Sequence, residues 1–263
     1  MPQLRLPEPF YARGEHLAID LPGAHALFTT RRGGFSVGPY ASLNLGRLTD
    51  DRPEAVQRNR AKLLDLLGVP PAHIRQIHGT FVRRITALPA AGVAPLPDEG
   101  VELPEADGQA TPLRDVAPMV LVADCLPVAL AGRGNGRGSA GAVAMLHVGW
   151  RGLSGGIVAQ GVRAVRELGV DGPLEAAIGP GAGVCCYEVG EEVHQVFAGS
   201  GDHVRRGRNR DLKAIARGEL ARAGAERVHD VGLCTICSAE SLFFSHRRDR
   251  GVTGRQAGVA WLS

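Results

Sequence analysis

The sequence predicts an α+β fold in which a mixed β-sheet core is covered by helices. Short apolar runs of β-leaning composition are interleaved with segments in which apolar residues recur at helical spacing. These segments do not follow one another at the regular intervals typical of a doubly wound parallel sheet. With 263 residues, 44% of them hydrophobic, the chain is long enough to bury roughly 70–75% of its unfolded surface without a disulfide or a metal.

The first predicted elements are a strand, a glycine-containing turn and a helix. Residues 26–30 are mostly apolar and β-leaning, and residues 31–34 follow them as a turn with two glycines. A helix is predicted over residues 53–67, because Pro53 suits a first helical turn and Gly68 suits a C-terminal cap. Two further strand-like runs follow, at residues 74–77 and 81–85.

A loop and three buried strands are predicted for the middle of the chain. Residues 87–105 are rich in Pro, Gly and acidic residues, which favours a long surface loop over a domain linker. Apolar runs predict buried strands at residues 116–123, 128–131 and 142–148. The Gly-rich segment 133–141 predicts the turn between the last two.

Helices and strands alternate again toward the C-terminus. Ser154 is a predicted N-cap for a helix whose apolar face ends before Gly169. Short strands are predicted at residues 174–178 and, as the closing element, at 255–262. Further helices are predicted over residues 189–197 and 211–223.

Charge and hydropathy argue against several classes of function. The 30 basic and 27 acidic side chains leave a net charge of +3, too small to predict nucleic-acid binding. No apolar run reaches the roughly 18–20 residues that span a bilayer, and the N-terminal segment lacks the apolar core of a signal peptide. We therefore expect a cytoplasmic protein with neither a nucleic-acid nor a membrane partner.

The five cysteines do not predict a disulfide framework, because their number is odd and the expected compartment is reducing. Cys234 and Cys237 form a lone C-x-x-C motif, which is weak evidence for a metal without a second pair, and we interpret them as structural thiols. Cys185 and Cys186 are adjacent, an arrangement that rarely binds one metal, and we interpret them as packing residues.

Three predicted strand ends carry side chains suited to metal or nucleophilic chemistry, namely His78, Cys125 and His147. Two imidazoles and a thiolate suit zinc and leave a fourth position open. In a second interpretation Cys125 is a nucleophile with His147 or His78 as its base. In a third, each residue is simply buried or hydrogen-bonded. Asp124 is expected to support the site from behind, because neighbours in a strand face opposite ways.

Eight segments together carry a resemblance to a known family. They are FTTRRGGFS (28–36), SLNLG (42–46), QIHGT (76–80), ADGQAT (106–111), VADCLPV (122–128), HVGWRGLSGGI (147–157), IGPGAGVCCYEVG (178–190) and FFSHRRDRGVTGRQA (243–257). On these segments the chain resembles the YfiH-type proteins, also called the laccase-domain or multicopper polyphenol oxidoreductase family. The resemblance implies a single domain over residues 1–263, with a mixed, β-sandwich-like core flanked by helices.

The resemblance also implies an activity and a site. It implies a zinc-dependent purine nucleoside phosphorylase that acts on adenosine, inosine and methylthioadenosine and also deaminates adenosine. His78, Cys125 and His147 would be the metal ligands and the catalytic residues, with copper as the alternative metal. The implied partners are purine nucleosides and phosphate, and we expect a monomer or a weak homo-oligomer.

Phosphorolysis requires guanidinium groups that hold a phosphate dianion. The candidates are Arg31, Arg151, Arg247 and Arg248. Arg31 and Arg151 are favoured, because each follows a predicted strand end within a family-like segment.

Other functions stay open. One is a peptidoglycan-editing hydrolase that uses Cys125 or the metal site on serine-containing precursors, and another is a non-catalytic module that binds nucleosides. A third is a copper-dependent polyphenol oxidase. Blue copper sites usually add an axial Met, and oxygen reduction needs a further His-rich cluster. The chain has nine His, three Met and no His-x-His pair, so we treat copper-dependent oxidation as secondary.

Overall fold

The computed structural model describes residues 5–88, 102–134, 141–239 and 242–263. Within these ranges the chain forms two six-stranded sheets, a two-stranded sheet and five α-helices. The first sheet has the spatial order β1 (Tyr11–Arg13), β2 (His16–Leu21), β3 (Ala24–Phe28), β14 (Gln256–Leu262), β7 (Ala117–Val122) and β4 (Pro71–Ala72). The second has the order β13 (Arg227–Asp230), β10 (Leu174–Ile178), β8 (Leu126–Gly132), β9 (Ala142–Val148), β6 (Gly108–Thr111) and β5 (Val82–Arg84).

Both sheets are mixed. In the first sheet β4 pairs with β7 in parallel, whereas the other pairs are antiparallel. In the second sheet the pairs β10–β13 and β5–β6 are parallel. The small sheet consists of β11 (Arg205–Arg206) and β12 (Asn209–Arg210).

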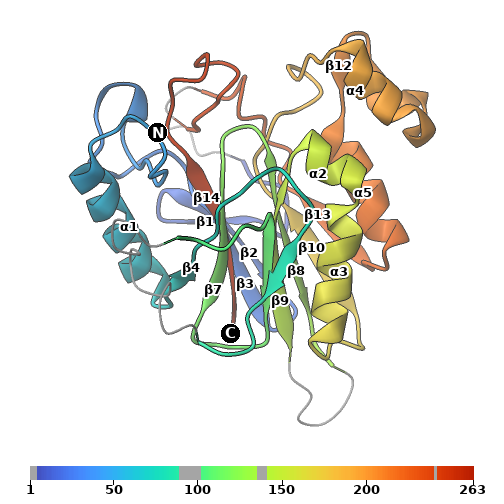
Figure 1. Cartoon of the computed structure of the whole chain (residues 1–263), viewed down its shortest axis with the longest axis horizontal. Coiled ribbons are helices and arrows are strands. Elements are labelled where there is room, and N and C mark those ends of the chain that lie inside the picture. The colour runs from blue at the N-terminus through green and yellow to red at the C-terminus, as the bar shows by residue number, and fades with distance from the viewer. Residues whose placement is uncertain (1–4, 89–101, 135–140, 240–241) are drawn as a thin grey trace.

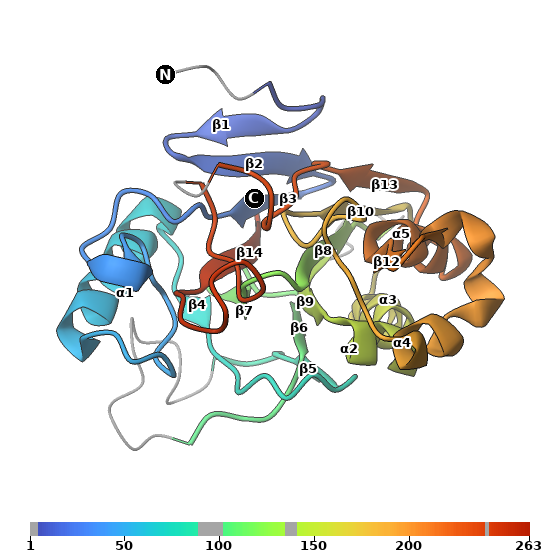
Figure 2. The ribbon, with the colours of Figure 1, turned by 90° about the horizontal axis from the view of Figure 1, so that it is seen from above.

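The two large sheets pack face to face, and helices cover their outer faces (Figure 1). Ile19 and Phe28 of the first sheet share one hydrophobic cluster with Val143 and Met145 of the second. The helices are α1 (Pro53–Leu67), α2 (Trp150–Gly155), α3 (Ile157–Glu167), α4 (Glu191–Val196) and α5 (Leu212–Arg222). Figure 2 shows α1 on one side of the strands and α3 and α5 on the other. The expected β-sandwich-like core flanked by helices is therefore confirmed.

The central strands β8 and β9 are buried on both faces, which explains their apolar sequences. All seven residues of β8 and all seven of β9 are buried. One face of these strands packs against the first sheet and the other against α3, so the strands read as continuous apolar runs. Gly161 of α3 lies so close to β9 that an added Cβ would be 2.5 Å from Leu146 Cδ1.

Several elements form where local signals predicted them. Helix α1 spans Pro53–Leu67, and Gly68 ends it in the left-handed conformation at φ 70°. Strands β9 and β10 coincide with the predictions for 142–148 and 174–178. The predicted helix over 211–223 forms as α5, and the carboxylate of Asp211 accepts a hydrogen bond from the Ala214 N–H.

Other expectations were wrong. Ser154 does not cap a helix, because its hydroxyl donates to the Arg151 carbonyl and Gly156, at φ 91°, separates α2 from α3. The strand predicted at 74–77 does not form, since β4 ends at Ala72 and only Arg75 makes a bridge, to Glu105.

The remaining differences concern short strands and two loops. The strands that were not predicted are short or mix polar with apolar residues, namely β1, β2, β4, β6, β11, β12 and β13. Most of the predicted loop 87–105 and of the predicted turn 133–141 lies outside the described residues. Within the described ranges, no helix combines the length and apolar character needed to cross a bilayer.

Candidate functional site

The site forms where strands of both sheets end. His78 lies between β4 and β5, Cys125 lies in the turn that joins β7 to β8, and His147 is the penultimate residue of β9. One ligand atom from each of the three lies within 4.8 Å of the other two. The fold therefore brings the three predicted residues together, in a geometry that a single ion can bridge. The two imidazole rings meet edge to face, with centroids 4.8 Å apart.

Asp107 organises the cluster, although the sequence analysis did not single it out. Its Oδ1 accepts hydrogen bonds from the His147 ring Nδ1 at 2.8 Å and from the His78 main-chain N–H at 2.9 Å. Its Oδ2 accepts from the main-chain N–H groups of Ile77 and Gly79 at 3.2 Å and 2.6 Å. Asp107 is fully buried. Since Nδ1 of His147 faces Asp107, Nε2 is the nitrogen left to face a metal.

The backbone at His78 adopts an unusual conformation. Its φ is 60°, in the left-handed region, which costs a non-glycine residue roughly 1–2 kcal/mol. The three main-chain hydrogen bonds to Asp107 offset this cost and hold the imidazole against the other ligands. Gly149 also brings the groups close, because a Cβ there would lie 3.0 Å from the Cys125 sulfur.

The charges of the cluster favour a thiolate. Burial alone would raise the pKa of Cys125, but His147 and His78 outweigh it and lower that pKa to about 6. Burial alone would lower the pKa of His147, but Cys125 and Asp107 raise it to about 9. At neutral pH these two shifts favour a thiolate beside an imidazolium. Such a thiolate can ligate a metal or act as a nucleophile.

Asp124 supports the turn that carries Cys125. Its φ is 90°, and its side chain is buried. Oδ1 accepts from the Thr235 hydroxyl at 2.6 Å, and Oδ2 accepts from the Arg247 main-chain N–H at 2.7 Å. Both carboxylate oxygens thus hold neighbouring loops, in agreement with the supporting position expected for Asp124.

Two of the four candidate arginines are engaged by internal partners. The Arg248 guanidinium donates to the carbonyls of Thr235 and Phe243 and to the Asp249 carboxylate. The Arg31 guanidinium donates to the carbonyls of Pro39 and Ala41 and stacks on the Phe244 ring. Both side chains therefore connect loop segments through hydrogen bonds to main-chain carbonyls.

The other two candidates are more accessible. Arg151 and Arg247 are exposed, and their guanidinium carbons lie over the rings of Trp150 and Tyr187 at 4.4 Å and 5.5 Å from the ring centroids. Arg247 also donates to the Glu188 carbonyl. Burial is the main reason why the pKa of Tyr187 is raised to about 12. The charge of Cys125 also raises this pKa, whereas the charges of Arg247 and Arg151 lower it.

Arg255 is a further cation near the cluster that the sequence analysis did not name. Burial lowers its pKa, and the charges of Cys125 and Asp124 oppose that shift. Its guanidinium donates to the Thr253 and Gly254 carbonyls. Asp107 and Arg255 both lie in the family-like segments 106–111 and 243–257, so these segments were the signal that could have identified them.

The other four cysteines form a second cluster. The sulfur atoms of Cys185, Cys186, Cys234 and Cys237 all lie within 4.8 Å of one another. The C-x-x-C motif therefore has a second cysteine pair beside it, Cys185 and Cys186. The interpretation of Cys185 as a packing residue is wrong, because this residue is exposed. All five cysteines are free thiols.

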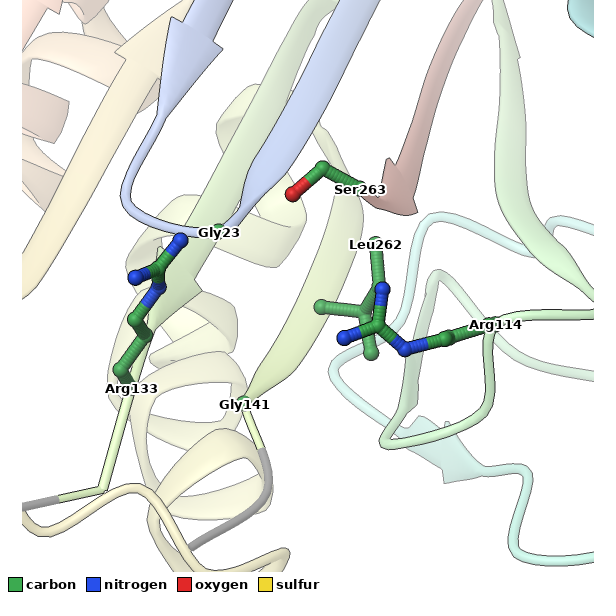
Figure 3. A pocket seen from close by; sticks show the side chains of 6 residues that line it. All are labelled: Gly23, Arg114, Arg133, Gly141, Leu262 and Ser263. Atoms are coloured by element: carbon green, nitrogen blue, oxygen red, sulfur yellow. The ribbon is translucent and has the colours of Figure 1, made fainter. Parts of the chain in front are cut away.

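A cavity of about 280 Å³ lies away from both clusters. Gly23, Arg114, Arg133, Gly141, Leu262 and Ser263 line it (Figure 3). Gly141 precedes β9, whose other end carries His147, so the cavity and the three-ligand cluster are at opposite ends of that strand. Its lining offers guanidinium groups but no thiol, imidazole or carboxylate side chain.

Comparisons with known proteins identify a matching family and similar proteins. The model of the family described as multi-copper polyphenol oxidoreductase laccase matches residues 25–263. A purine nucleoside phosphorylase of Xylella fastidiosa (strain Temecula1) is 39% identical over 257 residues, 92% of this chain and 93% of that protein.

Two solved structures are also similar. The Bacillus licheniformis hypothetical protein YfiH has a TM-score of 0.86 and 30% identity, covering 97% of this chain and 100% of that one. The Neisseria meningitidis protein NMB0706 has a TM-score of 0.78 and 36% identity, covering 95% and 100%.

Proposed function

Because this chain belongs to the multi-copper polyphenol oxidoreductase laccase family, we propose that it is a zinc-dependent purine nucleoside phosphorylase. The proposed substrates are adenosine, inosine and methylthioadenosine with phosphate, and the same site deaminates adenosine. Relatives named purine nucleoside phosphorylase support this assignment. The observation that carries it is the convergence of His78, Cys125 and His147 at one open end of the two sheets.

The donor set suits zinc. Two imidazoles and a thiolate are common zinc ligands, and three protein ligands leave one position for a reactant. The hydrogen bond from His147 to the buried Asp107 is the carboxylate–histidine arrangement that orients metal ligands. A zinc ion held there supplies a Lewis-acid centre at the point where the substrate binds.

The protein's own residues provide the remaining requirements. During phosphorolysis phosphate attacks C1′ of the ribose while the glycosidic bond breaks, and guanidinium groups hold the phosphate dianion. We assign this role to Arg151 and Arg247, the two exposed candidates, because the guanidinium groups of Arg31 and Arg248 are engaged by loop carbonyls. Ile77 and Phe81 precede and follow His78 in the chain, and we assign their exposed side chains as the apolar surface for the purine.

The copper-oxidase alternative has less support. Oxygen reduction by a laccase needs a further His-rich cluster. In the described part of the chain, His78 and His147 are the histidines that belong to a metal-ligand cluster, and the other such cluster is made of cysteines. Copper at the three-ligand site stays an alternative metal, since Cu²⁺ binds strongly to nitrogen and sulfur ligands.

Product analysis tests the proposal. Zinc-loaded protein is incubated with adenosine, with and without phosphate. We expect adenine and ribose 1-phosphate only when phosphate is present, and inosine in both samples. His147→Ala should abolish both reactions and lower the bound zinc, whereas His203→Ala, at an exposed histidine outside the cluster, should change neither.

Full activity of His147→Ala would contradict the proposed metal site. No turnover by zinc-loaded wild-type protein would contradict the nucleoside substrates, and serine-containing peptidoglycan precursors would then be tested. Inactivation by iodoacetamide but not by a chelator would favour Cys125 as a metal-free nucleophile.

A further inference from the structure

Sheet topology explains how the four remaining cysteines meet. Strands β10 and β13 are parallel neighbours, so their carboxyl ends lie at the same edge of the second sheet. The Cys185–Cys186 pair lies in the loop after β10, and the C-x-x-C motif lies in the loop after β13. A bridge between Gly181 and Cys234 continues the pairing into these loops. The Thr235 N–H also donates to the Gly181 carbonyl at 3.1 Å.

The distances suit one tetrahedral ion. A zinc–sulfur bond of about 2.3 Å places the sulfurs of a tetrahedral site about 3.8 Å apart. The sulfurs of Cys185 and Cys237 are 3.4 Å apart, and all four lie within 4.8 Å of one another. A disulfide would require a separation near 2.05 Å. The sulfurs are therefore not bonded to one another, and their spacing is close to the geometry of a four-sulfur metal site.

A main-chain group is already directed at one sulfur. The Gly183 N–H donates to Cys234 Sγ at 3.2 Å. Such donors stabilise a thiolate, the form that binds a metal. Gly183 allows the two loops to approach, because a Cβ there would lie 3.1 Å from both Cys185 Sγ and Cys234 Cβ.

The surroundings give an ion access to the cluster. Cys185 and Cys237 are exposed, so an ion can enter from solvent. Cys185 and Cys234 line a cavity of about 200 Å³ together with Lys213, Arg217 and Asp230. Asp211 also lines this cavity, so the two cations there are matched by two carboxylates, and Lys213 and Arg217 both pair with Asp230.

We propose that Cys185, Cys186, Cys234 and Cys237 bind a structural zinc ion, separate from the three-ligand site. Four cysteines leave no open position, which is typical of structural rather than catalytic zinc. Thr235 lies inside the C-x-x-C loop, and its hydroxyl bonds the Asp124 carboxylate beside Cys125. The ion therefore fixes the loop that supports the neighbouring turn of the candidate active site.

Metal analysis of variants tests this site. Wild-type protein reconstituted with zinc should hold two zinc ions per chain by mass spectrometric metal analysis. Cys185→Ser/Cys237→Ser should lose one of them and keep the other. Cys125→Ser, at a cysteine outside this cluster, should lose only the ion of the three-ligand site. In that variant, X-ray absorption should find the remaining zinc surrounded by four sulfurs at about 2.3 Å.

A second measurement uses wild-type protein alone, in case the double variant does not fold. Maleimide labelling followed by peptide mass spectrometry should show all four cysteines protected as a group with zinc and reactive after chelation. Equal labelling in both states would overturn the proposal. So would a Cys185–Cys237 disulfide in protein reconstituted under reducing conditions, or an iron chromophore in place of zinc.

Discussion

Asp107 accepts four hydrogen bonds, three from main-chain N–H groups and one from the His147 ring. Burial alone would raise the pKa of this carboxyl, but the hydrogen bonds from His147 and from the main chain lower it. The resulting carboxylate holds the His78 backbone and the His147 ring at once. One residue thereby positions two of the three candidate ligands.

We expect Asp107→Asn to weaken zinc binding at the three-ligand site by about 10–100-fold, the usual cost of losing a carboxylate that orients a metal-bound histidine. An amide has one acceptor oxygen, so it cannot accept all four hydrogen bonds. Competition with a chromophoric chelator measures the change. Asp115→Asn, at an exposed carboxylate, is the control, and equal affinity in both variants would contradict the assigned role of Asp107.

At the scale of secondary-structure elements, glycines have opposite effects at different positions. Gly68 ends α1 with φ 70°, and an added Cβ would meet no atom within 4 Å. Gly218 lies inside α5, where the nearest atom to an added Cβ is Arg222 Nη1 at 3.8 Å. Space is therefore available at both sites, and backbone conformation alone distinguishes them.

This contrast predicts opposite changes in stability. Gly68→Ala should lower the free energy of unfolding by about 1 kcal/mol, because alanine in a left-handed conformation is strained. Gly218→Ala should raise it by up to about 1 kcal/mol, because alanine favours the helix interior. Urea unfolding of the two variants measures both changes. The same sign in both would show that backbone conformation does not control these positions.

At the scale of the whole molecule, buried histidines link stability to pH. His16 and His73 are buried, and the His16 Nδ1 accepts a hydrogen bond from the Thr30 N–H. Burial lowers their pKa to about 4 and about 3, with neighbouring basic side chains adding to the effect. The unfolded chain therefore binds more protons than the folded chain between about pH 6.5 and pH 4.

Stability should consequently fall as the pH is lowered from 6.5 toward 4, by up to about 1.4 kcal/mol per pH unit for each histidine. The measurement is urea unfolding of metal-free protein across this range. Replacing either histidine with Gln should flatten the dependence, whereas His203→Gln, at an exposed histidine, should leave it unchanged. An unaltered slope in both His16→Gln and His73→Gln would contradict this source of acid sensitivity.

The sequence by itself determined the features that depend on neighbouring residues along the chain. Pro53 and Gly68 bound α1, and the apolar run Ala142–Val148 forms β9, because capping and patterning act locally. The family-like segments also identified His78, Cys125 and His147 before any distance between them was known. Short strands of mixed polarity, such as β6 and β13, carried no comparable local signal.

Only the tertiary structure decided which distant residues act together. Asp107 meets His147 across 40 positions, and Cys185 meets Cys237 across 52. The structure alone also shows that the Arg248 guanidinium donates to two loop carbonyls and is therefore not free to bind phosphate. The physical reason is that strand pairing places the ends of β6, β9, β10 and β13 at fixed positions. Hydrogen-bond and metal-ligand geometry depends on those positions and not on spacing along the chain.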